Sequence, residues 1–322
     1  MNTTNNLKSC LLIMPKEFYS FEKHLSQALN AKGFTVEVAN HEYPSGTIGK
    51  IMGTLQIPLI FPTTYKFFEK NFLAGRQYDL VLIIKGRGMS RRLIEKMSES
   101  AKKIVGYNWD SFKYNKSPLK WYKYVTNYYT FDYSDADRFS IPCVELYSSL
   151  PPDTEEKKIE YDISAIARNY SGRLAYIDTV FSTLKPARTF IYIYEQNKFD
   201  FILNFLKNPR LIIKYRKYIH FKPLKYNDYI NAIKGSEFTI DYAHSNQTGT
   251  TMRCYESISL KTKIISNNTY MKRSAYFNDT NCITFQPADK PENLLAAYER
   301  CRQTPFNSKA RDINTFMDEL LA

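Results

Sequence analysis

The sequence is poor in the residues that build disulfide frameworks and metal sites. Its 322 residues include five cysteines and four histidines, and no CxxC or HxxxH spacing occurs among them. Dispersed cysteines in an odd number indicate neither a disulfide framework nor a zinc site. We therefore expect a protein of the reducing cytoplasm.

Long apolar runs are also lacking. No stretch approaches the roughly 20 apolar residues that a membrane-spanning helix requires. The apolar run Cys10–Met14 is brief and has no small-residue cleavage site after it, so it predicts a buried first strand and not a signal peptide. Membrane contact is then expected to be peripheral, on the inner face of the cell membrane.

Acidic residues are outnumbered by basic ones. The chain has 45 Lys and Arg against 32 Asp and Glu, which gives a formal net charge of +13. This excess favours nucleic acid, an anionic membrane surface or phosphorylated small molecules as partners. No helix-turn-helix, zinc-finger or RRM signature occurs, and the basic residues are spread along the chain. Nucleic acid is therefore not expected as a partner, although a basic nucleic-acid-binding protein is the alternative from another class.

The order of apolar segments predicts an α/β protein of two domains. At 322 residues and 43% apolar content, the chain exceeds the usual size of one core. It opens with a βαβ pattern over Lys8–Ala39, in which Phe18–Ala31 is the helix, and a similar pattern restarts at Tyr161 after the Pro-rich, charged linker Ser148–Lys158. We predict an N-terminal Rossmann-like domain over 1–150 and a C-terminal one over 151–322, and we allow the last helix to pack back on the first domain.

Polar residues follow several predicted strands of the first half. Lys85 and Arg87 come after the apolar run Tyr78–Ile84, and Trp109 and Asp110 come after the next strand. Ligands of open α/β sheets bind at the carboxyl ends of strands, so these loops are expected to face one crevice and to bind substrate. A plain strand-to-helix turn is the alternative account of the glycines in this first loop.

Two further segments complete the first half. Tyr128–Asp137 is predicted as a strand end followed by acidic residues, and Pro142–Leu146 as a further strand. Asp135-Ala136-Asp137 is the one DxD pattern beside a strand end. A metal site there is the alternative to a solvated loop or helix cap.

The stretch Ser236–Asn268 is the clearest unit of the second half. It reads as a strand, a polar loop, a helix over Met252–Leu260 and a second strand. The free N–H groups of such a loop and the positive end of the helix suit a phosphate. Arg253 and Glu256 are three residues apart and share a helix face near this end. An ordinary capped helix with a surface Arg–Glu pair is the alternative.

Two local stretches, Ser164–Arg173 and Gln247–Glu256, resemble the first strand–loop and the donor-phosphate loop of GT-B nucleotide-sugar glycosyltransferases, those of bacterial capsule and lipopolysaccharide biosynthesis above all. The resemblance implies two Rossmann-like parallel-sheet domains that face each other across a cleft. It implies a nucleotide sugar bound to the C-terminal half, with Glu256 on the ribose. The residues then expected to bind the donor are Arg168, Arg173, His244, Thr248, Gly249, Thr250, Thr251, Arg253 and Glu256.

The sequence departs from the family at one position. Many retaining members have two glutamates eight residues apart, but Thr248 stands eight residues before Glu256, which leaves retention or inversion open. An inverting enzyme requires a base on the acceptor side; Asp110 is the first candidate, with Asp132 and Asp135 next. A helix cap is the alternative role for Asp110.

These expectations together describe a metal-independent enzyme. Arginines and helix-end N–H groups can neutralise a diphosphate leaving group, so no cofactor is expected. The predicted activity is transfer of a hexosyl-type unit to a glycan or lipid-linked acceptor in surface polysaccharide biosynthesis, with Lys85, Arg87 and Trp109 on the acceptor side. A non-catalytic sugar-binding member of a polysaccharide assembly complex is a further alternative.

Overall fold

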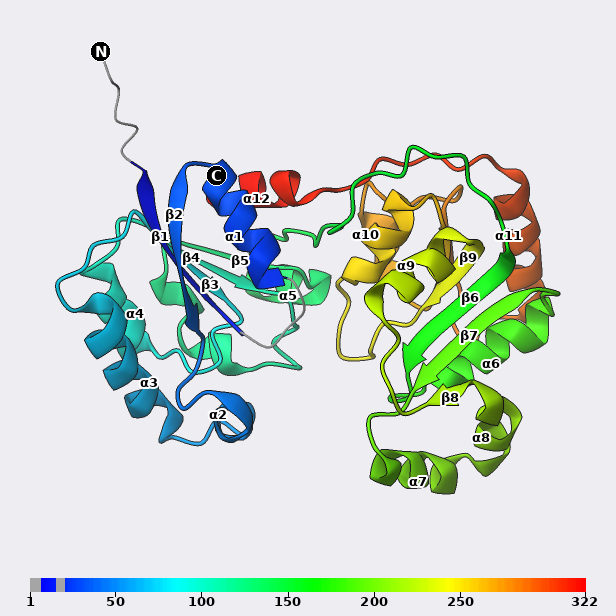
Figure 1. The fold of residues 1–322 in the computed structure, drawn as a ribbon, viewed down its shortest axis with the longest axis horizontal. Helices are drawn as coiled ribbons and strands as arrows, with labels where there is room; N and C mark the ends of the chain where they lie inside the picture. Colours follow the sequence, from blue (N-terminus) through cyan, green and yellow to red (C-terminus); the bar gives the residue numbers. More distant parts are fainter. Residues whose placement is uncertain (1–6, 16–20) are drawn as a thin grey trace, which may run out of the picture. The chain divides into compact units, whose positions relative to one another are not determined.

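The computed structural model describes residues 7–15 and 21–322. The chain divides into two compact units (Figure 1). Unit 1 comprises Met1–Ser149, Ser245–Gly249 and Asp312–Ala322, and unit 2 comprises Leu150–His244 and Thr250–Arg311. Each unit is built around one parallel sheet.

Unit 1 has a five-stranded parallel sheet in the order β2-β1-β3-β4-β5. Its strands are β1 (Lys8–Met14), β2 (Phe34–Asn40), β3 (Leu80–Ile84), β4 (Ile104–Asn108) and β5 (Asn127–Thr130). Its helices are α1 (Phe21–Ala31), α2 (Gly46–Thr54), α3 (Ile60–Phe68), α4 (Arg91–Ser98), α5 (Tyr133–Phe139) and α12 (Ile313–Leu321), with short helical turns at Glu69–Leu73, Ser117–Lys120 and Tyr122–Tyr124. The order reverses between β1 and β3, which is the switch point of this sheet.

The central strands of unit 1 are apolar because helices cover both faces of the sheet. All five residues of β3 are buried, as are the last five of β1. Ser90 caps α4 by accepting a hydrogen bond from the N–H of Leu93, and Leu93, Ile94 and Met97 bury the inner face of this helix. α12 adds Phe316, whose ring lies 5.1 Å from that of Tyr107 and 4.8 Å from that of Tyr147.

Unit 2 has a six-stranded parallel sheet in the order β11-β10-β9-β6-β7-β8. Its strands are β6 (Tyr161–Arg168), β7 (Thr189–Tyr194), β8 (Ile219–His220), β9 (Ser236–Asp241), β10 (Lys263–Ser266) and β11 (Cys282–Thr284). Its helices are α6 (Arg173–Leu184), α7 (Lys198–Lys207), α8 (Pro209–Tyr215), α9 (Tyr226–Lys234), α10 (Met252–Ser259) and α11 (Pro291–Gln303), with short turns at Arg216–Tyr218 and Thr269–Arg273. This is the strand order of the dinucleotide-binding Rossmann sheet, and it reverses between β6 and β9.

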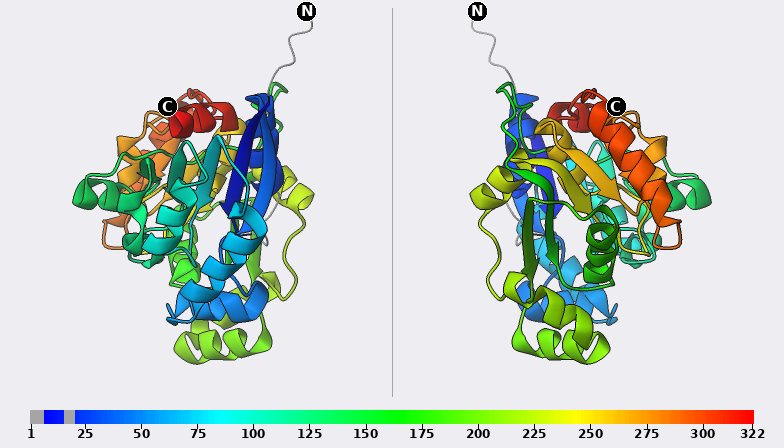
Figure 2. Two further views of the ribbon diagram at one scale, coloured as in Figure 1. Left: turned by 90° about the vertical axis from the view of Figure 1, so that its left-hand side faces the viewer. Right: turned by 90° about the vertical axis from the view of Figure 1, so that its right-hand side faces the viewer.

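The helices of unit 2 lie on both faces of its sheet. α6, α8 and α11 contribute Ile177, Ile212 and Leu294 to one core with the buried side chains of the strands. α9 and α10 lie on the other face (Figure 1). In Figures 1 and 2, α7 and α8 lie at one end of the unit, beyond the end of the sheet.

Most predicted elements are present, and the differences have local causes. Pro142–Leu146 is not a strand, because the segment meets the sheet only in a single bridge between Thr130 and Cys143 and Pro142 has no N–H to donate. The part of the first predicted helix before Phe21 lies outside the described residues.

Candidate functional site

The switch point of unit 2 brings together the loops that follow β6 and β9. β6 ends at Arg168 and β9 at Asp241, and the two strands are direct neighbours in the sheet. The loop after β6 turns sharply into α6, with Ser171 and Gly172 both at positive φ (56° and 83°). A Cβ on Gly172 would lie 3.3 Å from the hydroxyl of Tyr242, so a residue without a side chain fits here.

The loop after β6 is tied down by buried polar groups. The side-chain amide of Asn169 donates to the carboxylate of Glu195 at 2.5 Å, and its backbone N–H donates to the carbonyl of Tyr194 at 2.9 Å. Glu195 is buried, and burial raises the pKa of its carboxyl despite the amide hydrogen bonds that it accepts. Arg168, at the start of the loop, is 3.6 Å from the carboxylate of Asp200. The backbone of this loop is therefore held in place independently of any ligand.

Arg173, Arg253 and Asp241 form what we call the cationic site. Arg253 lies 3.6 Å from Asp241 and donates to the carbonyl of Ile166 at 3.0 Å, and Thr251 donates to the same aspartate at 2.9 Å. Arg173 stacks on Tyr170 at 4.3 Å, and its buried Nε–H has no hydrogen-bond partner among the described residues. Asp241 thus pairs with Arg253, whereas the neighbouring Arg173 makes no ion pair among the described residues.

The charges in the cationic site act on one another. Burial, and after it the charge of Arg253, lower the pKa of Arg173. Burial is the largest influence on the pKa of Arg253 and would lower it, but Asp241 and the other negatively charged groups nearby together outweigh burial, and the pKa is raised. Arg253 is therefore the paired cation and Arg173 the one that an added anion would stabilise.

The start of α10 lies beside the cationic site. Thr251 precedes the helix in an extended conformation and makes no side-chain cap, so the first N–H groups of α10 remain available at the positive end of its dipole. Thr250 is buried, and its hydroxyl has no hydrogen-bond partner in the described part of the chain. A helix end with free donors and an unsatisfied hydroxyl matches the needs of a phosphate oxygen.

Glu256 is placed differently from a surface partner of Arg253. It is 6% exposed, and its two oxygens accept hydrogen bonds from Tyr226 at 3.2 Å and Tyr229 at 3.0 Å. Burial, and then the charge of Glu256, raise the pKa of Tyr229 well above its usual value, so this hydroxyl stays protonated and donates. The surface Arg–Glu pair that was the alternative interpretation of this helix is therefore wrong.

The loop residues Thr248 and Gly249 are held by an aspartate of unit 1, to which Ser245–Gly249 belongs. Asp132 accepts hydrogen bonds from the backbone N–H groups of Thr248 at 2.6 Å and Gly249 at 3.3 Å. A Cβ on Gly249 would lie 2.4 Å from the ring of Phe131, so this close packing requires glycine. Two N–H groups that the sequence assigned to a phosphate are thus occupied by a carboxylate in this structure.

His244, the remaining predicted donor residue, lies near the start of the loop between β9 and α10. Its ring stacks near that of Tyr170, with centroids 6.1 Å apart. The guanidiniums of Arg173 and Arg168 lie 4.3 and 5.4 Å from the centre of the Tyr170 ring. The predicted donor residues Arg168, Arg173 and His244 are therefore grouped around this tyrosine. No contact in unit 2 assigns His244 a chemical role.

In unit 1, Lys85, Trp109 and Asp110 lie together at the carboxyl ends of β3 and β4. Lys85 is 2.6 Å from the carboxylate of Asp110 and 5.7 Å from the ring centre of Trp109. Gln247 also donates to Asp110, at 3.3 Å. Asp110 begins no helix, so the cap that was its alternative role is wrong. Lys85 has φ +64°, an uncommon conformation for a lysine that is often found at functional sites.

The next residue of this loop packs on a tryptophan. A Cβ on Gly86 would lie 2.4 Å from Trp121, whose indole N–H donates to the Gly86 carbonyl at 3.1 Å. Gly86 is therefore explained by a tight strand-to-helix turn, as the alternative interpretation of this loop held.

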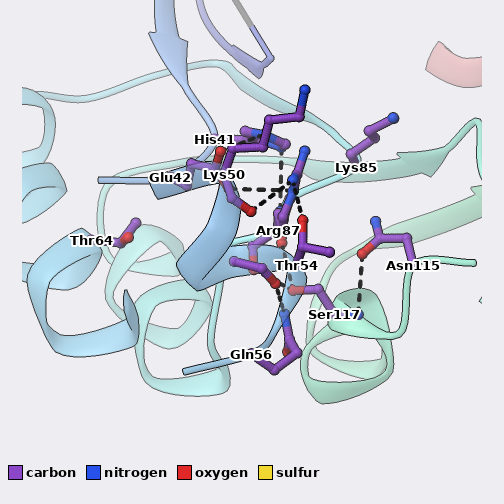
Figure 3. Close-up of polar contacts among 12 residues, drawn as sticks. His41, Glu42, Lys50, Thr54, Gln56, Thr64, Lys85, Arg87, Asn115 and Ser117 are labelled. Carbon is purple, nitrogen blue, oxygen red and sulfur yellow. Dashed lines mark hydrogen bonds and ion pairs between the residues drawn. The ribbon is translucent and has the colours of Figure 1, made fainter. Parts of the chain in front are cut away.

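Arg87 belongs to a buried polar cluster with His41 and Glu42, shown in Figure 3. Its guanidinium is 3.3 Å from Glu42 and donates to Thr54 at 2.8 Å, while its backbone N–H lies 3.4 Å from Nδ1 of His41. His41 and Glu42 are 1% and 4% exposed, and burial lowers the pKa of His41 despite the carboxylate 3.7 Å away. Gly53 of α2 allows this packing, since a Cβ there would lie 2.5 Å from Glu42.

No role was predicted for His41 or Glu42 from the sequence. Both follow the end of β2, so their place at a strand end was the available signal. The signal was weak, because one histidine and one glutamate after a strand are more often surface residues than members of a buried cluster.

Asp132 and Asp135 organise the start of α5. Asp132 caps the helix by accepting from the N–H of Asp135 at 3.0 Å. Asp135 is buried and accepts a hydrogen bond from the N–H of Phe112 at 2.5 Å. Burial raises the pKa of Asp135 to about 6. Within residues 7–15 and 21–322, no three His, Cys, Asp or Glu side chains gather as metal ligands would.

The comparisons with known proteins concern the fold. No protein-family model and no curated protein matches the chain. Among solved structures, the lipopolysaccharide outer core galactosyltransferase WaaB is similar at a TM-score of 0.59 and 12% identity, over 97% of this chain and 98% of that chain. An α-glucosyltransferase in complex with UDP and a 13-mer DNA is similar at a TM-score of 0.56 and 13% identity, over 98% and 95%.

A third similar structure is an enzyme of another kind. The UDP-GlcNAc 2-epimerase of Methanocaldococcus jannaschii matches at a TM-score of 0.55 and 12% identity, over 98% of each chain. At such low identities the likeness concerns the fold and not the reaction. Together with the strand orders of the two parallel sheets, these matches establish that the chain has the GT-B fold.

Proposed function

We propose that the chain is a glycosyltransferase that moves a sugar from a nucleotide-sugar donor to a glycan or lipid-linked acceptor in bacterial surface polysaccharide biosynthesis. The observation that carries this proposal is the cationic site, where Asp241 pairs with Arg253 and the neighbouring Arg173 makes no ion pair among the described residues. A nucleoside diphosphate would supply the negative charge that this site lacks. The site also lies at the switch point of its sheet, where ligands of α/β folds bind.

The donor is expected to bind in unit 2 through its diphosphate and ribose. Arg173, Arg253 and the first N–H groups of α10 would hold the diphosphate, and the free hydroxyl of Thr250 would add a hydrogen bond. Glu256 would hold the ribose through acceptor capacity beyond the two tyrosine hydrogen bonds. Neutralisation of the leaving diphosphate by two guanidiniums requires no metal ion, so turnover in EDTA is expected to be unchanged.

The acceptor side is assigned to unit 1. In an inverting transfer, the acceptor oxygen attacks the anomeric carbon, the bond from that carbon to the diphosphate breaks, and a base takes the hydroxyl proton. We assign the base to Asp110, which Lys85 orients at 2.6 Å, and the stacking of the acceptor sugar to Trp109. Asp135 is the second candidate, with its carboxyl held by the Phe112 N–H.

The test is calorimetric titration with UDP, GDP, CMP and TDP sugars. Wild-type protein is expected to bind at least one of them, Arg173→Ala is expected to weaken binding on the order of tenfold or more, and Arg300→Ala, an exposed arginine of α11, is the matched control. Binding that is absent, or that is the same in Arg173→Ala, contradicts the proposal.

The same titrations can be followed by product analysis. One solved structure of this fold is an epimerase and another holds DNA, so the donor is incubated with and without acceptor and with an oligonucleotide. Sugar transfer is the expected product. An epimerised donor without transfer would indicate an epimerase instead of a transferase. Donor binding without any turnover would indicate a sugar-binding member of an assembly complex.

A further inference from the structure

Helix α7 exposes an apolar face of the kind that a helix of a globular protein normally buries. Phe199, Ile202, Leu203 and Leu206 follow helical spacing and form one stripe, yet these side chains are between 38 and 71% exposed. No residue of α7 is buried. An apolar stripe of this kind normally faces a core, so its exposure here requires an explanation.

The inner face of α7 combines Phe201, which packs against the core of unit 2, with two polar side chains that attach the helix to this unit. Asn204 donates to the carbonyl of Asn169 at 3.0 Å and to the carboxylate of Glu195 at 3.1 Å, and Asp200 lies 3.6 Å from Arg168. Asn197 caps the helix by accepting from the N–H of Asp200 at 2.8 Å. These contacts fix which face points outward, so the exposed stripe is a property of the fold.

Basic residues surround the apolar stripe. The segment 198–222 contains seven Lys and Arg and one acidic residue, Asp200, which faces inward toward Arg168. At 100° per residue, Lys198 and Lys207 flank the stripe on either side. In α8, Ile213 is 64% exposed and lies between Arg210 and Lys217 in the chain. The surface thus combines apolar side chains with a high positive charge.

We propose that the outer face of α7, together with Ile213 and the basic residues of 198–222, is a docking surface for an anionic membrane. The apolar stripe would enter the boundary between headgroups and acyl chains, while the lysines and arginines would bind the lipid phosphates. Charge complementarity selects this occupant, because an apolar protein partner or a second copy would bring no negative charge to match the basic rim.

The location of this surface extends the proposed function, on which its biological use rests, since a lipid-linked acceptor lies in the membrane. α7 is ten residues long and is too short to cross a bilayer. Across the described ranges, none of the helices has the length and apolar character of a membrane span. The inner-face contacts of Asn204 and Asp200 end on the loop after β6, so a docked α7 would sit directly behind a donor loop.

The experiment measures co-sedimentation of the full chain, without donor, with vesicles of phosphatidylcholine alone or mixed with phosphatidylglycerol. We expect binding to the mixed vesicles that weakens as salt is raised. Ile202→Ser with Leu206→Ser is expected to lower the partition coefficient about tenfold or more. Leu295→Ser, an exposed leucine of α11, is the matched control and is expected to bind as the wild type does.

Charge-reversal variants test the electrostatic part of the membrane proposal in the same co-sedimentation experiment. Lys207→Glu with Arg210→Glu is expected to weaken binding to the mixed vesicles and to remove its salt dependence. Equal binding by all variants, or no binding by the wild type, overturns the proposal. A dimer in light scattering that Ile202→Ser with Leu206→Ser dissolves also overturns it, in favour of a second copy as occupant. Donor titrations on the same variants test the proposed glycosyltransferase function separately. Normal donor binding without vesicle binding would contradict only the membrane proposal.

Discussion

The two sheets differ in how the cations at their carboxyl ends are neutralised. In unit 1, Lys85 lies 2.6 Å from Asp110 and Arg87 lies 3.3 Å from Glu42, so each cation has a carboxylate of its own. In unit 2, Asp241 pairs with Arg253, and the neighbouring Arg173 makes no ion pair among the described residues. Both edges have arginine or lysine, and in unit 2 the partly buried Arg173 has no counter-ion of its own among the residues described.

This difference separates two uses of a basic residue. A cation that is paired within the fold holds loops together and adds little attraction for a ligand, whereas an unpaired cation beside a helix start attracts an anion. The formal net charge of +13 does not distinguish these cases. Local pairing does, and it is the ground on which we propose that the diphosphate binds to unit 2 and a neutral, hydroxyl-bearing substrate to unit 1.

The largest expected effect comes from removing the ligand-binding groups of unit 2. Arg253→Ala and Glu256→Ala are each expected to reduce turnover on the order of a hundredfold, as the loss of one preorganised stabilising group does. Arg253→Lys keeps the charge but loses the two-pronged guanidinium, and it is expected to fall between wild type and alanine. Initial rates with saturating acceptor measure the effect; thermal melting checks the fold. Near-normal rates in both alanine variants would mean that α10 is structural.

A smaller effect is expected from breaking a pair in unit 1. Glu42→Gln leaves the partly buried guanidinium of Arg87 without its counter-ion and is expected to cost about 3 kcal/mol of unfolding free energy. Donor affinity is expected to stay unchanged. Urea denaturation measures the stability, and Glu95→Gln, which breaks the exposed pair with Arg91, is the control with no expected change in midpoint. The comparison between units fails if Glu42→Gln alters nucleotide binding.

The smallest expected effect concerns pH. The pKa of Asp135 is about 6 in the folded chain, above its usual value of 3.8, so the folded state retains a proton that the unfolded state loses. The stabilisation is therefore complete below about pH 4 and is lost as the pH rises through 6, by on the order of 2 kcal/mol. Asp135→Asn is expected to flatten this part of the stability curve. An unchanged slope between pH 4 and 6 would show that another group titrates.

The helices, the strands and the polar residues at strand ends could be predicted from the sequence, because they depend on the local spacing of apolar residues. The βαβ unit at 236–266 and the polar ends of β3 and β4 follow directly from apolar periodicity and parallel-sheet geometry. The loop after β6 was expected beside the start of α10 from the family resemblance, and the structure has β6 and β9 as neighbours at the switch point of the sheet.

Contacts between segments that are far apart in the sequence could not be predicted from it. Asp132 binds the N–H groups of Thr248 and Gly249 more than a hundred positions along the chain, and no local pattern specifies this contact. The stripe on α7 shows a second limit. Its spacing is that of a helix with one apolar face, but spacing does not tell whether the face meets a core or solvent.

The most direct test of the account is a crystal structure with the nucleotide product of the donor that titration identifies. The account predicts that the diphosphate lies within hydrogen-bonding distance of the guanidiniums of Arg173 and Arg253 and of the first N–H groups of α10. The account is contradicted if the diphosphate binds instead at Lys85 and Arg87. It is also contradicted if the nucleotide binds elsewhere and Asp241 remains the only anion in the cationic site.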